Sequence, residues 1–155
     1  MTHAQTFRAY RAGDEIELAR LEALVEPTPW TAGDFLDVPK NGWSCEVMVD
    51  DEGLIQAWAV VMPVLDEAEL LTIGVCPDVQ GKGYGRAMLN HMLTRMQNEN
   101  RTRCHLEVRE SNVRAIRLYE SSDFVRVGLR KNYYRTAEGR EHAVLMTREF
   151  GGKAC

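Results

Sequence analysis

The chain has 155 residues, of which 45% are hydrophobic and 27% are charged, and its formal net charge is −4. This length suits one globular domain with a core of its own. The acidic balance argues against the broad positive surface that direct nucleic-acid binding needs, and it mildly favours a basic peptide as partner. No apolar run is long enough to cross a membrane, and residues 1–5 lack the features of a signal peptide. We therefore expect a cytoplasmic protein that binds neither a membrane nor nucleic acid directly.

No linker, repeat or low-complexity tract divides the sequence, so we expect a single domain at residues 1–150 and a short tail at 151–155. The cysteines have no C-x-x-C spacing, which favours buried reduced thiols over a zinc site or a disulfide framework. They are Cys45, Cys76, Cys104 and Cys155, and we expect the last to be exposed on the tail. No metal site is indicated. The sequence leaves the oligomeric state open, with a monomer as one option.

The first part of the chain predicts a strand followed by two helices. Residues 5–10 alternate as an edge strand does, and a Gly-Asp pair then precedes an amphipathic helix. The apolar residues of this helix are Ile16, Leu18, Ala19, Leu21 and Leu24. Two prolines break it, and Thr31 begins a second, short helix at about 32–36. Trp30, beside these prolines, is either a core anchor or a recognition surface, and the core is favoured.

The middle of the chain predicts a hairpin and then a strand, loop and helix. Residues 43–49 and 54–62 are β-branched and apolar on either side of an acidic, glycine-containing turn, and Pro63 is expected to end the second strand. An apolar strand at 70–75 precedes a helix at 84–98. The predicted core face of this helix is Ala87, Met88, Leu89, Met92, Leu93 and Met96.

The last third predicts a strand at 103–109, a short helix capped by Ser111 or Asn112, and strands near 124–130 and 143–150. The order of elements is then β-α-α-β-β-β-α-β-α-β-β. This order predicts an α/β (α+β) fold with a mixed central sheet flanked by helices, antiparallel in its N-terminal half. Fold class alone leaves the function open.

A glycine-rich loop separates the strand at 70–75 from the helix that follows. Its glycines leave the backbone amides open, and the free N–H groups and dipole of a helix start favour a phosphate. A Walker loop is excluded because the Lys-Ser/Thr pair is missing, and the dinucleotide fingerprint fails because Arg86 occupies its third glycine position. The loop consists of Gln80, Gly81, Lys82, Gly83, Tyr84, Gly85 and Arg86. It is either a connection without a ligand or, by its resemblance to the Q/R-x-x-G-x-G/A loop of the GNAT (GCN5-related) N-acetyltransferases, a cradle for the pyrophosphate of coenzyme A.

Alternation in the strand at 103–109 places Glu107 on a polar face with His105 and Arg109. One interpretation is a structural carboxylate paired with Arg109 or Arg103. The other is a base that accepts a proton from an amine, directly or through a water, next to an acyl donor. The residues alone favour neither.

Tyr119 shares a helix face with Ile116 at spacing i and i+3, so we expect it to be partly buried. It is either a core tyrosine whose hydroxyl finds a backbone partner or a proton donor. In an acetyl transfer, a phenol near the leaving thiolate of coenzyme A could protonate it.

Further motifs sharpen the resemblance. Leu-Glu-Val-Arg-Glu-Ser-Asn lies at 106–112, Asn-Tyr-Tyr at 132–134 and Gly-Arg-Glu at 139–141, with Pro-Trp-Thr at 29–31. Together with the glycine-rich loop, these motifs resemble the RimI family of bacterial ribosomal-protein-alanine N-acetyltransferases over nearly the whole chain. The loop is shared by the superfamily, whereas the motifs at 132–141 are specific.

The resemblance implies the GNAT acyl-CoA N-acyltransferase fold, acetyl-CoA as co-substrate and no metal. It also implies Glu107 as general base, Tyr119 as general acid and Asn112 as a coenzyme A contact. The implied acetyl-holding strand edge is Ile73, Gly74 and Val75. The implied partner is the N-terminal segment of small-subunit ribosomal protein number eighteen, acetylated on its alanine. Alternatives are other protein N-termini, lysines or a small amine as acceptor, and a non-catalytic module that binds coenzyme A.

Two positions depart from the pattern of the family. Asp123 stands where glycine is usual after the helix, so a non-glycine residue is expected to adopt the left-handed cap. His142 stands where aspartate is usual after Gly-Arg-Glu. The second departure bears on acceptor specificity more than on catalysis.

Overall fold

The computed structural model describes residues 5–151, so Cys155 and most of the expected tail lie outside the described residues. The described strands form one mixed sheet of seven in the order β1-β2-β3-β4-β5-β7-β6, and the chain order of strands and α-helices is the one predicted. The described chain divides into two compact units. The first unit comprises the described residues up to Pro63 together with Leu70–Met92. The second unit comprises Val64–Glu69 together with the described residues from Leu93 onward. The single domain at 1–150 stays a prediction.

The first three strands of the chain pair antiparallel. β1 (Thr6–Ala9) pairs with β2 (Ser44–Val49), and β2 pairs with β3 (Ile55–Val64). Met48 of β2 lies opposite Phe7 of β1 on one side and opposite Ala57 of β3 on the other. The predicted hairpin is therefore confirmed.

The strand boundaries around Pro63 differ from the prediction. β3 continues through Pro63 to Val64, and β4 begins at Glu67 and runs to Val75, earlier than the predicted residue 70. The prediction that Pro63 ends its strand was wrong. The pairing with β2 ends at Val61, so the missing N–H of Pro63 costs no hydrogen bond on that side.

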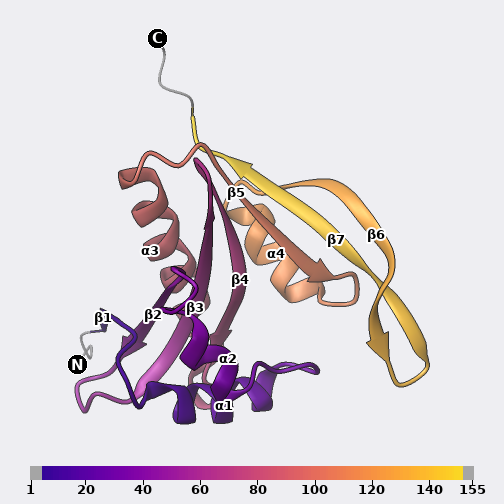
Figure 1. Ribbon diagram of the computed structural model, residues 1–155. Helices are drawn as coiled ribbons and strands as arrows, with labels where there is room; N and C mark the ends of the chain where they lie inside the picture. The colour runs from indigo at the N-terminus through magenta and orange to yellow at the C-terminus, as the bar shows by residue number, and fades with distance from the viewer. Residues whose placement is uncertain (1–4, 152–155) are drawn as a thin grey trace. The chain divides into compact units, whose positions relative to one another are not determined.

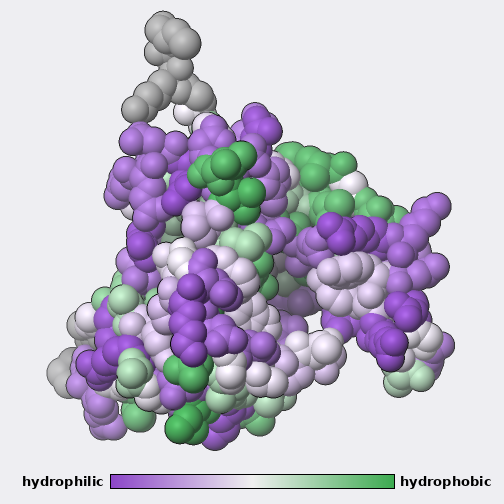
Figure 2. All heavy atoms as spheres, in the orientation of Figure 1, coloured by the Kyte–Doolittle hydropathy of each residue, from purple (hydrophilic) through white to green (hydrophobic). Residues whose placement is uncertain are grey.

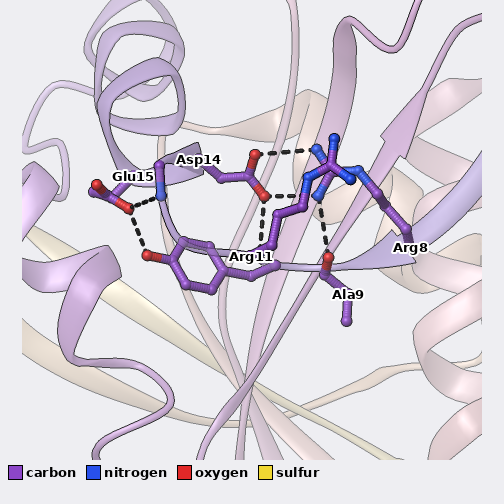
Figure 3. A network of polar contacts seen from close by, with 7 residues as sticks. Arg8, Ala9, Arg11, Asp14 and Glu15 are labelled. Carbon is purple, nitrogen blue, oxygen red and sulfur yellow. Dashed lines mark hydrogen bonds and ion pairs between the residues drawn. The ribbon is translucent and has the colours of Figure 1, made fainter.

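Hydrogen bonds between residues close in sequence stabilise the start of the first helix. α1 (Asp14–Val25) starts after Gly13, which has a positive φ of 104°. The Asp14 carboxylate accepts hydrogen bonds from the Arg8 guanidinium at 2.7 and 3.0 Å and from the Arg11 N–H at 2.9 Å (Figure 3). Burial by itself would raise the pKa of Asp14, but these donors outweigh it and the pKa is lowered.

α2 (Ala32–Asp37) begins with a capping box. The Asp34 N–H donates to Thr31 Oγ1 at 3.2 Å, and the Thr31 N–H donates to the Asp34 carboxylate at 2.9 Å. The predicted start at Thr31 is confirmed. Trp30 packs against the core with its ring centroid 5.3 Å from that of Phe35, in agreement with the core interpretation.

The core of the first unit lies where α1 and α2 meet the strands. Its fully buried large side chains include Leu18, Leu21, Phe35, Val38 and Trp58. The predicted apolar face of α1 was too wide, because Ile16 is 71% exposed and Leu24 is 59% exposed. Glu22 is instead one of the buried residues of α1.

α3 (Tyr84–Asn98) has the predicted bounds. Most of its predicted core face is buried, namely Met88, Leu89, Met92, Leu93 and Met96, whereas Ala87 is half-buried. Among the described thiols, Cys45 and Cys104 are buried and Cys76 is partly exposed. Burial raises the pKa of Cys45 to about 12. No helix in the described part of the chain is long and apolar enough to span a membrane.

The second unit contains a parallel pair and a long antiparallel hairpin. β4 and β5 (Arg103–Arg109) are parallel, with Glu69 opposite His105. β5 also pairs antiparallel with β7 (Gly139–Glu149), which in turn pairs with β6 (Val125–Thr136). Figure 1 shows β6 and β7 as a long ribbon and α4 as a short helix in this unit.

The β6–β7 hairpin is longer than predicted. Strand pairing continues past residue 130 to Thr136 opposite Gly139, although the register shifts between Arg130 and Tyr134. Polar and apolar residues do not alternate cleanly at positions 130–136, so the pairing of this part of β6 depends on β7 and not on a local sequence pattern. Val125 and Val127 on β6 are exposed, and Figure 2 shows hydrophobic and hydrophilic residues side by side on the hairpin.

Candidate active site

The glycine-rich loop joins β4 to α3 through a 3-10 helix at Pro77–Val79. Gly81 and Gly83 both have φ of +83°, and a Cβ at either residue would meet nothing within 4 Å. The glycines are therefore required by the backbone and not by crowding. The Ala87 N–H makes a helical bond to the Gly83 carbonyl at 3.0 Å, so the amides just before Ala87 are those of a helix start. This geometry suits a phosphate.

Side chains fix the loop at both ends. Gln80 donates through Nε2 to the Val75 carbonyl at 3.3 Å, and Gln5 donates to the Tyr84 hydroxyl at 3.1 Å. Lys82 and Arg86 are exposed cations, and Gly85 lies inside the first turn of α3. The loop therefore offers both backbone donors and positive charge to an anion.

The predicted strand edge includes a close contact that the sequence did not indicate. A Cβ at Gly74 would lie 2.1 Å from Cζ2 of Trp58, so only glycine fits over this ring. Ile73 and Val75 beside it are half-buried in β4. Gly74 thus lets the strand pass close to the buried tryptophan.

Glu22 is a buried residue that sequence reasoning missed. It is 1% exposed, and its carboxylate accepts hydrogen bonds from Trp58 Nε1 at 3.0 Å, Thr72 Oγ1 at 2.7 Å and the Trp30 N–H at 2.7 Å. These bonds connect α1 with β3, β4 and the segment before α2, all within the first unit. A carboxylate in the middle of an apolar helix face was the available signal, because such a group is buried only when it has partners.

Glu107 has a different partner from the two considered in the sequence. Its carboxylate pairs with Arg130 of β6 at 3.1 Å, and its side chain is 21% exposed. Arg109 instead contacts Glu141 at 3.6 Å and lies 4.3 Å from the Tyr134 ring centroid. Within the interpretation of Glu107 as a structural carboxylate, the partner is therefore neither Arg109 nor Arg103, because β6 brings in an arginine that is distant in sequence.

Arg103 and His105 are engaged elsewhere on β5. Arg103 contacts Glu67 at 3.5 Å and Glu149 at 3.2 Å. His105 lies 2.6 Å from the Glu67 carboxylate through Nε2 and 2.8 Å from Thr147 Oγ1 through Nδ1. Period-two alternation along β5 is confirmed, with its apolar side chains buried and its polar ones half-buried.

α4 (Val113–Ser121) positions the predicted proton donor. Asn112 caps the helix, since its side-chain oxygen accepts a hydrogen bond from the Ala115 N–H at 3.2 Å. Tyr119 is 7% exposed, and its ring centroid lies 5.7 Å from that of Phe124. Tyr119 is thus anchored in the core.

Both departures from the family pattern have a structural role. Asp123 has a positive φ of 70°, as expected for a left-handed residue at the end of the helix. His142 Nδ1 accepts a hydrogen bond from the Asn132 N–H at 2.9 Å, and Asn132 itself has a φ of 53°. His142 therefore stabilises the irregular part of β6.

The predicted site residues fall into two sets. The first unit contains the loop and the strand edge, whereas the second contains Glu107, Tyr119 and Asn112. The second unit brings Glu107 next to Arg130, and the loop forms a phosphate-compatible helix start. Residues 5–151 contain no group of three or more His, Cys, Asp or Glu side chains arranged to hold a metal ion.

Comparison with known proteins shows the family of the chain. The model of the acetyltransferase (GNAT) family matches residues 14–124. The chain is 37% identical to the ribosomal protein bS18-alanine N-acetyltransferase of Escherichia coli strain K12 over 126 residues, which cover 81% of this chain and 84% of that protein. It is 33% identical to the enzyme of the same name from Haemophilus ducreyi, over 83% of this chain and 89% of that protein.

A solved structure gives the same result for the fold. The crystal structure of the ribosomal-protein-S18-alanine N-acetyltransferase from Escherichia coli superposes with a TM-score of 0.89 at 32% identity, covering 98% of this chain and 99% of that one. The mixed sheet with its helices is therefore the GNAT fold. The chain belongs to the GNAT acetyltransferase family and is an acetyl-CoA-dependent N-acetyltransferase.

Proposed function

We propose that this enzyme transfers an acetyl group from acetyl-CoA to the N-terminal alanine of ribosomal protein bS18. The observation that carries the proposal is the 37% identity to the bS18-alanine N-acetyltransferase of Escherichia coli, over 81% of this chain and 84% of that enzyme. The family match at residues 14–124 includes β4, the loop, β5 and α4, which bear the candidate site. The partner is then the N-terminal segment of that ribosomal protein, and the reaction takes place in the cytoplasm.

In the proposed reaction, Glu107 acts as general base. The acceptor nitrogen loses a proton to its carboxylate, directly or through a water, and attacks the carbonyl carbon of the acetyl group. An α-amino group has a pKa of ~7.7–8.0, so a carboxylate can complete its deprotonation near neutral pH more easily than that of a lysine at ~10.4. The contact with Arg130 at 3.1 Å would hold the Glu107 carboxylate in a fixed orientation.

Tyr119 is the proposed general acid. When the tetrahedral intermediate collapses, the carbon–sulfur bond breaks and the thiolate takes a proton from the phenol. Packing against Phe124 fixes the ring, so that the hydroxyl has a defined position. An amide of the strand edge at 73–75 would stabilise the oxyanion.

The glycine-rich loop and Asn112 would hold coenzyme A. The amides at the start of α3 and the cations of Lys82 and Arg86 suit its phosphates. Asn112 uses its side-chain oxygen to cap α4, which leaves its amide NH₂ group as the donor for such a contact.

A panel of acceptors tests the proposal. The enzyme is incubated with acetyl-CoA and, in separate reactions, with a peptide that copies the bS18 N-terminus, the same peptide starting with serine, an N-terminally blocked peptide containing lysine, and spermidine. We expect acetylation of the alanine peptide at the highest kcat/KM, read by mass. A preference for the lysine peptide or for a small amine such as spermidine would overturn the proposed acceptor.

A further inference from the structure

Two neighbouring parallel strands carry a polar face made of four half-buried side chains. β4 contributes Glu67 and Glu69, and β5 contributes His105 and Glu107. Glu69 lies opposite His105 in the register, and Glu107 follows two residues along the same face. The alternate residues of the two strands face the other side and are buried, namely Ala68, Cys104 and Leu106.

Three of these four side chains have a close partner. Glu67 and His105 are in contact at 2.6 Å, and Glu107 contacts Arg130 at 3.1 Å. The Glu69 side chain makes no hydrogen bond or ion pair with any of residues 5–151. The face therefore carries a carboxylate without a cation of its own, next to the proposed base.

The environment of Glu69 is unfavourable for its charge. Burial raises the pKa of this carboxyl, and the nearby Glu107 charge raises it further, while His105 and Arg130 act in the opposite direction. An unpaired carboxylate of this kind costs stability, and such groups are concentrated at functional sites. The missing cation is thus expected to come from a ligand.

We propose that Glu69 binds the positively charged amino group of the acceptor and holds it beside Glu107. The inference rests on the proposed function, in which the acceptor is an α-amino group. Such a group, with a pKa of ~7.7–8.0, arrives mostly as an ammonium ion near pH ~7. Glu107 is already paired with Arg130, so Glu69 supplies the uncompensated negative charge. One ammonium proton stays hydrogen-bonded to Glu69 while another passes to Glu107.

The test is the variant Glu69→Gln, which keeps the shape of the side chain and removes its charge. We expect KM for an alanine-initiated peptide to rise about tenfold at pH ~7, as for loss of a hydrogen bond to a charged group, with kcat changed less than about twofold. The effect should shrink toward pH ~9, where the amine is neutral. The acetylated product peptide, which lacks the charge, should inhibit parent and variant equally.

Glu67→Gln is the matched control, because Glu67 lies on the same strand and face but already contacts His105 and Arg103. We expect this variant to melt at a lower temperature and to keep the parental KM for the peptide. Glu69→Asp, which retains the charge, should keep KM within a few-fold of the parent. Glu69→Gln should melt no lower than the parent, since it loses an unfavourable charge.

The outcomes distinguish a wrong proposed acceptor from a wrong role of Glu69. A parent enzyme that acetylates lysine or a small amine in preference to the alanine peptide overturns the proposed acceptor, and KM for the amine it prefers then tests Glu69 in the same way. A parental KM in Glu69→Gln overturns the role of Glu69 alone. An equal rise of KM in Glu67→Gln also overturns it, because the effect would then belong to the general charge of the face.

Discussion

The glycine-rich loop and the polar face of β4 and β5 differ in what they offer to a ligand. The loop presents backbone amides, and the residues it needs are glycines that adopt φ of +83°. The polar face presents side-chain charges, among them Glu107 paired with Arg130 and Glu69 without a partner among residues 5–151. A backbone site depends on conformation and is largely independent of pH, whereas a side-chain site depends on charge. Of these two regions, only the polar face should therefore respond to a substitution that preserves shape and removes a charge.

The largest effect should come from Glu107→Gln, which keeps shape and removes basicity. If Glu107 removes the amine proton, turnover near pH ~7 should fall by ~10²–10⁴-fold, the usual contribution of a general base. The loss should shrink as pH rises through ~7.7–8.0, because the amine then supplies its own neutral form. A pH–rate profile on an alanine-initiated peptide measures this.

Glu149→Gln is the control for Glu107→Gln, since Glu149 is an exposed carboxylate at the end of β7 that contacts Arg103. Its profile should match that of the parent. If Glu107→Gln instead gives a profile parallel to the parent with a lower melting temperature, Glu107 is a structural partner of Arg130 and the polar face has no catalytic base.

Tyr119→Phe should lower turnover by ~10²-fold, because only the proton donor is lost and the ring still packs against Phe124. Acetyl-CoA affinity, measured by calorimetry, should stay within about twofold of the parent. Parental turnover in this variant would make Tyr119 a core residue and leave the thiolate to depart without assistance. The comparison would then assign all acid–base chemistry to β5.

Gly83→Val addresses the loop. A β-branched residue at φ of +83° is strained by roughly 1–2 kcal/mol, and its side chain would project where a phosphate is expected to approach. We expect acetyl-CoA affinity to fall about tenfold or more, with no change in the pH profile of the remaining activity. Gly85→Ala, inside α3, should bind acetyl-CoA like the parent. Unchanged affinity in a folded Gly83→Val would remove the phosphate role from the loop.

The turn between β4 and α3 was predictable from sequence because its information is local, whereas its binding of a phosphate stays a prediction. Three closely spaced glycines after an apolar strand and before a helical pattern predict a tight turn at the start of a helix, and Thr31 identified the start of α2 in the same way. Alternation in β5 correctly separated its polar from its buried face. Each of these features is decided within a few residues of the chain.

For the polar face, the sequence predicted that Glu107 lies on it but not which residue pairs with Glu107, because that residue is distant in sequence. Arg130 reaches Glu107 only through the pairing of β6 with β7 and of β7 with β5, which no local pattern specifies. Glu69 was not singled out, since its significance depends on the parallel register with His105. Glu22 was missed for the same reason, because its hydrogen-bond donors lie on three other segments.

The smallest effect concerns stability against pH, where Glu141 and Glu69 should behave in opposite ways. The pKa of Glu141 is lowered because the Ser111 N–H donates to its carboxylate at 3.0 Å, with Arg109 nearby. Its stabilisation is therefore present above the ordinary value of 4.5 and is lost as pH falls through the lowered pKa. Glu141→Gln should melt about 1–2 °C below the parent at pH ~6 and converge with it as pH falls below that lowered pKa.

Glu69 has a raised pKa, so its charge destabilises the folded chain at pH values above that pKa and has no effect below the ordinary value of 4.5. Glu69→Gln should therefore melt slightly above the parent at pH ~6, with the difference disappearing as pH falls below 4.5. Melting curves of both variants across this range decide the point. If Glu69→Gln melts below the parent at pH ~6, Glu69 has a stabilising partner, and the uncompensated charge that distinguishes the polar face from the loop does not exist.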